Sequence, residues 1–286
     1  MKPYGRRMQM LVVDKRNMKK IYGLVFCLFG IVLLMSQQKG YVAFYNLQYK
    51  LDSLDRNNIR NEAFILNFED SKSSFLSLTQ YRADSIIAKD RNEGMQQLGN
   101  LMSLPISKFK KVIVKNFSAR KMDVYDLIVS EKYHYIENLP PLQWSLKDEF
   151  KTVDRFKVQK AETYYAGRNY VAWFAREIPI FDGPYKFTGL PGLIIEIHDS
   201  RYDYHFKLTN LFKKDKDWPL VYNKSPKEMI FTDKNKFHSI LESHKKNPMI
   251  KFNAKGIYFK DQEAESRKMI ERKSKENNPI ELKPVK

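Results

Sequence analysis

Short runs of aromatic and β-branched residues dominate the chain from residue 41 to residue 211 and predict β-strands. The clearest run alternates apolar and polar residues from Tyr202 to Leu208, as is typical of a half-buried strand. The run before it, "GLIIEI", is apolar at successive positions and favours a more central strand, with "HDSR" as a short hairpin turn between the two. Further strands are expected at 41–51, 63–69, 111–117, 122–129 and 132–139.

The predicted hairpin also gathers polar residues. If Glu196 faces His205 and His198 faces Asp203, the register is self-consistent and all four side chains lie on one face. Carboxylates and imidazoles about 5 Å apart across neighbouring strands are able to ligate zinc or to share a proton. The alternative is a solvated polar face whose opposite charges pair weakly. We treat the four as weak catalytic candidates and predict neither a metal site nor a cofactor.

Beyond residue 211 the apolar spacing becomes helical. Phe237, Ile240 and Leu241 share one helix face, after an N-cap at Thr232 or Asp233 and before a proline that follows the last turn. This pattern predicts an amphipathic helix that docks on the sheet. Residues 261–278 favour a helix but are nearly all polar, so we expect that helix to be exposed to solvent.

These elements predict an α+β fold, predominantly β, in which a curved antiparallel sheet is packed by a C-terminal amphipathic helix. One domain is expected after the first 36 residues. Residues 37–211 form its β part, with an irregular or partly helical insertion near 70–110, and residues 212–286 form a helical extension that packs on the same domain.

Residues 18–36 have the layout of a secretory signal peptide, with two lysines, an apolar run at 21–35 and the small Ser36. As a helix this run reaches only ~22 Å, less than the ~30 Å hydrocarbon core of a bilayer, which favours cleavage over an uncleaved anchor. Residues 1–17 add charge but no apolar span, so we interpret Met18 as the start and the preceding residues as an over-extended gene prediction. The protein is therefore expected to be exported, as a periplasmic, outer-membrane-associated or secreted protein.

Export changes what the composition implies. The only cysteine, Cys27, would leave with the signal, which excludes disulfides, thiolate zinc sites and cysteine nucleophiles. The formal charge of the 286-residue chain is +18, and removal of residues 1–36, with seven basic side chains and one acidic, would leave +12. The protein is thus basic, but it has no nucleic-acid-binding motif, so nucleic acid is not expected as a partner. An anionic envelope surface is one candidate partner, and simple solubility is the plainer explanation of the charge.

Glycine and proline concentrate in the stretch 183–199, "GPYKFTGLPGLIIEIHD". Gly183 and Pro184 predict one turn, and the glycines and proline of 189–192 predict a second corner before the buried strand. One interpretation is purely architectural. The other is that the residues between the corners project as an aromatic and cationic binding tip, formed by Tyr185, Lys186, Phe187 and Thr188.

The same stretch, within 167–199, resembles the signature of the GLPGLI family of secreted bacterial envelope proteins. The six residues of the family's name are present as Gly189, Leu190, Pro191, Gly192, Leu193 and Ile194, after Gly183 and Pro184. The resemblance extends to "QKAETYYAGR" and to "NNPIEL" (277–282), although Val158 stands where many relatives have a cysteine. It implies an envelope protein of unknown activity, with no catalytic residue to carry over.

Two classes of function follow. The first is a non-enzymatic binding or accessory module for an envelope protein, peptide or glycan, which would use the open sheet face or the 185–188 tip. The second is a hydrolase-like envelope enzyme that uses the carboxylate and histidine face. The chain has no G-x-S-x-G elbow, phosphate loop or dinucleotide fingerprint, which favours the first. Membrane contact is expected only through an uncleaved signal. Ser53 and Ser85 resemble short sites of O-linked glycosylation.

Overall fold

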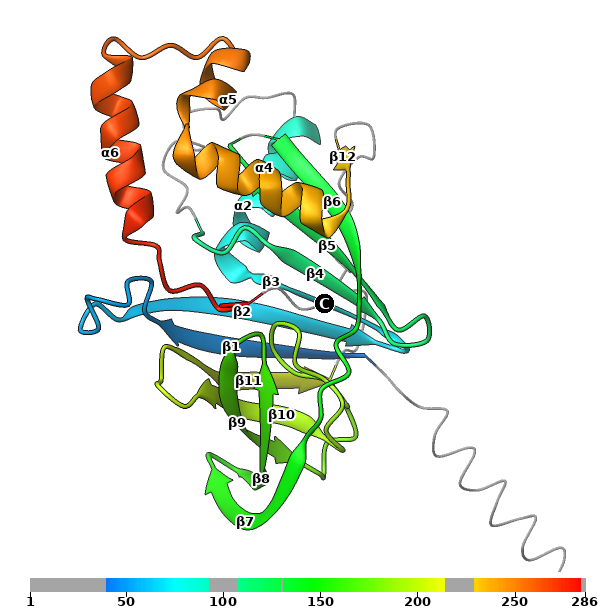
Figure 1. Ribbon diagram of the computed structural model, residues 1–286. Helices are drawn as coiled ribbons and strands as arrows, with labels where there is room; N and C mark the ends of the chain where they lie inside the picture. Colours follow the sequence, from blue (N-terminus) through cyan, green and yellow to red (C-terminus); the bar gives the residue numbers. More distant parts are fainter. Residues whose placement is uncertain (1–39, 93–106, 130, 214–228, 284–286) are drawn as a thin grey trace, which may run out of the picture. The chain divides into compact units, whose positions relative to one another are not determined.

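Twelve strands form one sheet in the computed structural model, which describes residues 40–92, 107–129, 131–213 and 229–283 (Figure 1). The strand order is β12-β6-β5-β4-β3-β2-β1-β11-β10-β9-β8-β7, so β12 and β7 are the edges of an open sheet. Neighbouring strands are antiparallel except β12 and β6, which run parallel. The prediction of a predominantly β, mostly antiparallel fold is confirmed, whereas the predicted signal segment lies outside the described residues.

The helices that the structure describes lie in two parts of the chain: one directly follows the third strand, and the other three follow the last strand. The strands are β1 (Tyr41–Tyr49), β2 (Arg60–Glu69), β3 (Lys72–Ser77), β4 (Val112–Asn116), β5 (Lys121–Ile128), β6 (Glu131–Asn138), β7 (Ser145–Val153), β8 (Phe156–Tyr165), β9 (Arg168–Ala175), β10 (Leu193–Asp199), β11 (Tyr204–Lys213) and β12 (Met229–Phe231). The helices are α2 (Leu78–Asn92), α4 (Lys234–Lys246), α5 (Met249–Ala254) and α6 (Gln262–Ser274). The expected insertion near 70–110 thus contains β3 and α2.

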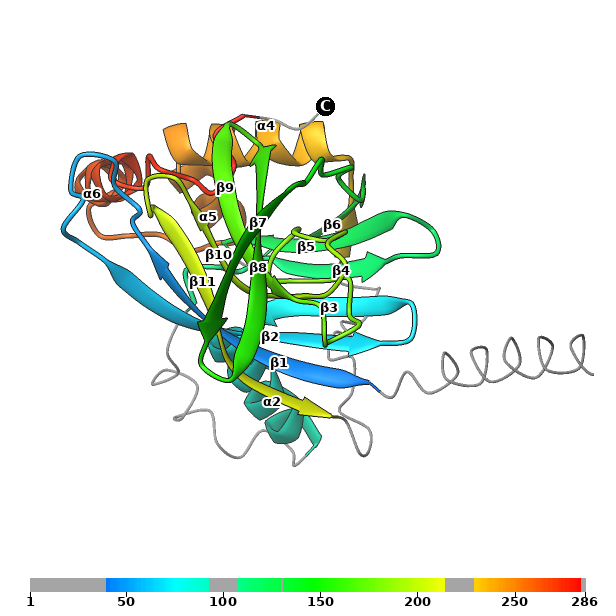
Figure 2. The ribbon, with the colours of Figure 1, turned by 90° about the horizontal axis from the view of Figure 1, so that it is seen from below.

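Contacts across the sheet show that it bends around the connection between β9 and β10. Five strand positions separate β4 from β10, which is roughly 24 Å in a flat sheet. Yet Lys115 Nζ of β4 lies 2.5 Å from Asp182 Oδ1, in the connection just before β10. The connection therefore lies against one sheet face, and strand direction turns steadily from β6 through β1 to β8 (Figures 1 and 2).

The predicted hairpin of β10 and β11 forms, but its register differs by two residues from the predicted one. His198 pairs with His205 and Glu196 pairs with Lys207. The loop is longer than predicted because Asp199 closes it: its Oδ1 accepts from the Tyr204 N–H, and its carbonyl accepts from the Tyr202 N–H. An even shift keeps Glu196, His198 and His205 on the same face. Asp203 lies in the loop before β11 and pairs with Arg168 instead.

Helix α4 begins where the cap pattern predicted. Asp233 is its N-cap and accepts a hydrogen bond from the Lys236 N–H. Phe237 is fully buried, with its ring 5.0 Å from that of Tyr135 and 5.4 Å from that of Tyr133, both on β6. These ring contacts place the apolar face of α4 against the β6 end of the sheet.

Arg168, the first residue of β9, binds the C-terminal segment that follows α6 to the sheet. The guanidinium donates to Asp199, Asp203 and Asn278 and to the carbonyls of 279 and 280, at 2.7–3.2 Å. Asn278 in turn donates through Nδ2 to the Lys50 carbonyl at 2.8 Å. Irregular backbone that is buried needs such partners.

Replacing Arg168 by methionine should destabilise the protein by about 3–5 kcal/mol, because two buried carboxylates lose their shared cation. Arg56 also contacts Asp203, but its side chain is 40% exposed, so Arg56→Met should cost only about 0–1 kcal/mol. Urea unfolding followed by circular dichroism measures both values. Equal effects of the two substitutions would contradict this view of the Arg168 cluster.

Candidate functional site

The four residues expected at a projecting tip are buried. Lys186 is 1% exposed and Phe187 0%, and Tyr185 and Thr188 are likewise buried. The prediction of a projecting tip is therefore wrong, for a physical reason: Lys186 has carboxylate partners inside the fold. Its Nζ lies 2.9 Å from Glu137 at the end of β6 and 2.7 Å from Glu281 in the C-terminal segment.

Glu281 is the centre of this buried network. Besides Lys186, it accepts hydrogen bonds from the hydroxyls of Tyr185 at 2.5 Å and Tyr165 at 3.2 Å. Burial alone would raise the pKa of Glu281, but the charges of Lys186 and Lys111 and these hydrogen bonds outweigh it and lower the pKa to about 2. The network joins the 183–192 corner to both β6 and the C-terminal segment.

Gly192 is the position in the 183–192 corner where the backbone conformation most requires glycine. Its φ of +151° is unfavourable for other residues, and a Cβ there would lie 2.2 Å from the Ala175 carbonyl oxygen. Tyr185 itself has φ of +56°, a rare value for an aromatic residue, and its buried hydroxyl contact with Glu281 holds it there. These constraints favour the architectural interpretation of the corner.

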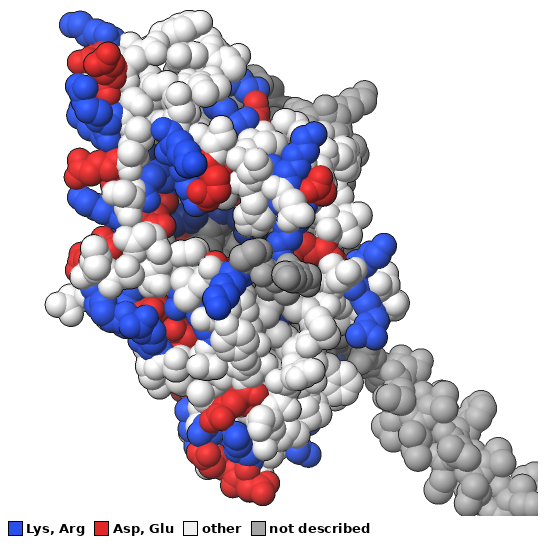
Figure 3. Space-filling model, in the orientation of Figure 1, with Lys and Arg blue, Asp and Glu red and all other residues white. Residues whose placement is uncertain are grey.

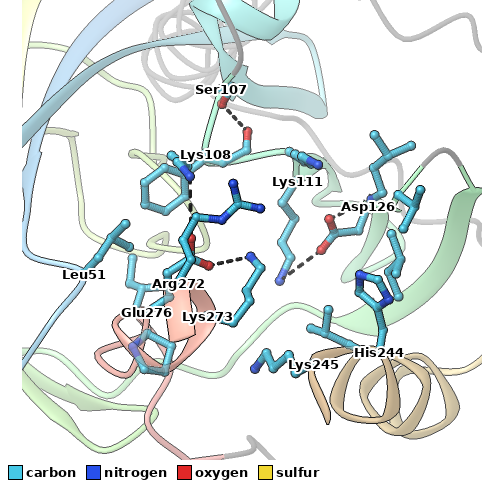
Figure 4. A pocket seen from close by; sticks show the side chains of 18 of the residues that line it. Leu51, Ser107, Lys108, Lys111, Asp126, His244, Lys245, Arg272, Lys273 and Glu276 are labelled. Carbon is cyan, nitrogen blue, oxygen red and sulfur yellow. Dashed lines mark hydrogen bonds and ion pairs between the residues drawn. The ribbon is translucent and has the colours of Figure 1, made fainter. Parts of the chain in front are cut away.

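A chamber of about 580 Å³ lies between the sheet and the helices α4, α5 and α6 (Figure 4). Its floor is aromatic and aliphatic: the rings of Phe64 and Phe75 stack at 4.9 Å, and Phe109 meets Phe64 edge-on at 5.4 Å. Ile113 and Ile128 complete the floor. Tyr185 is the member of the predicted tip that lines the chamber. The volume falls within the ~300–1,000 Å³ of small-molecule sites.

Basic side chains surround this apolar floor, and carboxylates are fewer. The basic lining residues are Lys108, Lys110, Lys111, Lys245, Arg272 and Lys273, and the acidic ones are Asp126 and Glu276. Figure 4 shows Lys108 and Lys273 converging on Glu276, while Lys111 points to Asp126 on the other side. Figure 3 shows basic side chains gathered near the hollow between α6 and α4. The lining is therefore apolar at depth and positive at its rim.

Two groups of the rim have no partner within the described ranges. Lys110 forms no ion pair there, and burial together with the charges of Lys273 and Lys108 lowers its pKa. The buried Nδ1 of His244 also has no hydrogen-bond partner in the described part of the chain. Burial and nearby lysines lower the pKa of His244, so the imidazole is neutral at pH 7. The rim thus has hydrogen-bonding capacity that the fold leaves unused.

The other predicted cluster is divided by the structure. Glu196 stays with His205 at 2.8 Å and with Lys151 at 2.7 Å, and hydrogen bonds from these partners lower its pKa to about 2 against the effect of burial. His198 stacks on Tyr202 at 3.9 Å. Asp203 belongs instead to the Arg168 cluster. His198 also keeps His205 as a neighbour, with ring centroids 5.6 Å apart, so Glu196, His198 and His205 stay together and Asp203 does not join them. Among the described residues no group of three or more side chains that could hold a metal ion forms.

Sequence reasoning missed the chamber because its walls come from distant segments. Residues near 109 and 126 meet residues near 245 and 273 only in the folded chain. One local signal was available. In "SKFKKVIV" (107–114), three lysines lie next to an apolar run that predicts a buried strand, so charge is placed beside that strand. In the described part of the chain, none of the helices combines the length and apolar character required to cross a bilayer.

Fold and chamber together define an open, mostly antiparallel sheet protein with a helix-covered chamber. Residues 147–196 match the model of a family described as "Protein of unknown function (Porph_ging)". This match runs from β7 into β10 and includes the 183–192 corner. The resemblance to GLPGLI proteins overlaps the matched residues and stays a prediction. No curated protein matches the chain.

Solved structures show the same fold. Two structures of PNGF-II, in space groups P21 and C2, each match with a TM-score of 0.51 and 13% sequence identity. Both matches cover 72% of this chain, but only 34% and 33% of the respective PNGF-II chains. The chain therefore spans about a third of the length of the solved structures it matches, and at this identity the likeness concerns the fold alone.

Stability should fall with acid between about pH 5 and pH 2, and Glu281 should contribute to the fall. Its folded pKa of about 2 lies below the ordinary value of 4.5, so the unfolded chain binds the proton first as the pH decreases. Glu281→Gln should flatten the pH profile of the free energy of unfolding in this window. The exposed Glu263→Gln is the matched control, and identical profiles for both variants would refute the assignment.

Gly192→Ala should destabilise the fold by about 3 kcal/mol or more, because positive φ and the contact with the Ala175 carbonyl act together. Gly256 also has positive φ, +70°, but nothing lies within 4 Å of the position that a Cβ would take there, so Gly256→Ala should cost only about 1 kcal/mol. Urea unfolding of both variants decides the matter. A Gly192→Ala variant as stable as Gly256→Ala would mean that the corner is not packed as described.

Proposed function

We propose that the protein is a non-enzymatic binding module whose chamber holds an anionic amphiphile: a molecule with one apolar chain and a carboxylate or phosphate head. The observation that carries this proposal is the combination of a phenylalanine and isoleucine floor with a rim in which cations outnumber carboxylates. Lys110 and Arg272 have no ion pair within the described ranges, and cations without a carboxylate partner repel one another, so they favour an anion.

In this proposal the apolar chain of the ligand lies on the floor of the chamber. Phe64, Phe75 and Ile113 belong to the central strands and are almost completely buried, so the surface they offer is preformed. Burial of apolar ligand surface contributes about 25 cal/mol per Å². A rigid floor of this kind stabilises the bound chain without ordering new side chains.

The anionic head belongs at the rim. Lys110 has no described partner, and Lys108 shares Glu276 with Lys273, at 3.6 and 2.5 Å. A ligand anion would offset the mutual repulsion of these lysines and would accept hydrogen bonds from them. The neutral His244 imidazole offers a further polar contact from α4.

The compartment in this proposal is the cell envelope. The signal-peptide layout of residues 18–36 supports export to the periplasm or the outer surface, where anionic amphiphiles are abundant. Asp203 pairs with Arg168, and Glu196 already pairs with Lys151 and His205, so the carboxylates of the face predicted for a hydrolase are engaged in ion pairs, and this supports binding as the proposed function. A protein, peptide or glycan partner on the sheet's outer face remains a separate prediction.

Titration calorimetry of the purified chain with dodecanoate and dodecanol tests the chamber. Dodecanoate should bind at least about ten-fold more tightly than the neutral alcohol, since a tenfold difference corresponds to about 1.4 kcal/mol for the rim contacts. Lys110→Gln should reduce dodecanoate affinity and leave dodecanol affinity unchanged. Lys236→Gln, on α4 but outside the chamber lining, is the matched control.

Leu241→Trp tests the apolar part of the chamber independently of charge. Leu241 lines the chamber from α4, so a larger ring should fill the space and abolish binding of both probes. Thermal unfolding verifies that the variant is folded. Equal affinity for acid and alcohol, or full binding by a folded Leu241→Trp variant, would contradict the proposed function.

A further inference from the structure

A segment of the helical region combines basic and apolar residues without any acidic one. Residues 243–260, "SHKKNPMIKFNAKGIYFK", contain five lysines and neither aspartate nor glutamate. They span the end of α4, all of α5 and the loop to α6. The bounding carboxylates are Glu242, which pairs with Lys245, and Asp261, which caps α6. The segment is therefore a local concentration of positive charge.

Three large apolar side chains of this segment face solvent. Ile250 is 57% exposed, Ile257 45% and Tyr258 70%. Single exposed aromatic residues such as Phe150 and Phe181 occur elsewhere and are normal for soluble domains. Here three lie within nine residues, on one short helix and the loop that follows it, and form an apolar feature that is concentrated in the sequence. Figure 3 shows the surface over α5 and this loop as mostly uncharged, with basic and acidic side chains at its margin.

The lysines around this feature differ from those of the neighbouring helix. On α6, basic residues pair with carboxylates of the same helix, as Arg267 does with Glu263 and Lys275 with Glu271. In the segment, Lys251 pairs with Glu131 of β6. Lys246, Lys255 and Lys260 are exposed and have no ion pair within the described ranges. Their charge is available to an external anionic partner.

We propose that residues 246–260 form a membrane-docking tip, in which Ile250, Ile257 and Tyr258 enter the interface of an anionic lipid bilayer and Lys246, Lys255 and Lys260 bind its headgroups. Apolar side chains ringed by lysines suit this boundary, because the aliphatic stems stay near the acyl chains while the ammonium groups reach the phosphates. Tyrosine prefers the same depth. Since Pro248 and Phe252 also line the chamber, the tip lies beside it, but the proposal does not depend on chamber binding.

The test reads insertion at the tip itself, so that membrane binding by residues 21–35 does not confuse it. In the full chain with Cys27→Ser, the exposed Ala254 is replaced by cysteine and labelled with an environment-sensitive fluorophore. Vesicles of phosphatidylglycerol and phosphatidylcholine should shift its emission to the blue, and phosphatidylcholine alone should not. The reference label is at Lys157→Cys on β8, which Figure 1 shows away from α5.

Two sets of substitutions separate the two contributions. Lys255→Gln and Lys260→Gln should each weaken partition to anionic vesicles about five-fold, and Ile257→Ser with Tyr258→Ser should weaken it at least ten-fold. Phe150→Ser removes an equally exposed ring and should have no effect. The proposal is overturned if the label at 254 does not shift, if the label at 157 shifts equally, or if the serine variant inserts like the parent. These substitutions should leave dodecanoate binding in the chamber unchanged, so membrane docking and chamber binding can each be refuted without the other.

Discussion

Buried positive charge is the constraint on which the interior of this protein depends. Lys115, Arg168 and Lys186 have side chains exposed by 3% or less, and each buried cation must meet a carboxylate or be strongly destabilising. None of the three finds its partner on its own strand. The partners come from the β9–β10 connection, the β10–β11 loop, the end of β6 and the C-terminal segment: Asp182, Asp199, Asp203, Glu137 and Glu281. Pairing these charges therefore fixes how distant segments cross the bent sheet.

This constraint explains why the glycine- and proline-rich corner is structural rather than exposed. A corner that carries Lys186 inward must approach β6 and the C-terminal segment closely, and Gly192 permits the approach of backbone to the Ala175 carbonyl. The side chains thus fix the position, and the glycine removes the steric obstacle. Tyr185 connects this architecture to the chamber, because its hydroxyl contacts Glu281 while the residue also lines the chamber wall.

Local patterns were sufficient to predict β1, β2, β4 to β6, β10 and β11, the cap of α4 and the helical character of α6, whereas β3, β7 to β9 and β12 were not predicted. The two-residue alternation at 202–208 reports a half-buried strand whatever its neighbours are, and the Asp233 cap depends on contacts three residues away. The hairpin register was missed by two because Asp199 lengthens the loop through side-chain bonds that spacing does not reveal. Burial of Lys186 could not be predicted at all, since its partners lie 49 and 95 residues away in sequence. The chamber has the same origin: its cations resemble solvated lysines until α4 to α6 fold over them.

The distribution of charge distinguishes the scaffold of this protein from the regions to which we assign binding. The deep cations have short, direct carboxylate contacts, and the basic residues of α6 pair within their own helix. At the chamber rim, by contrast, Lys110 is partly desolvated beside other lysines, and burial together with the charges of Lys273 and Lys108 lowers its pKa. A folded state that carries such repulsion gains stability when an anion binds, because a ligand that binds only the folded form shifts the folding equilibrium toward it. Desolvated cations require anions. Where the anion is a carboxylate of the same chain, the pair stabilises the scaffold, and where the chain supplies none, the cation favours an anionic ligand.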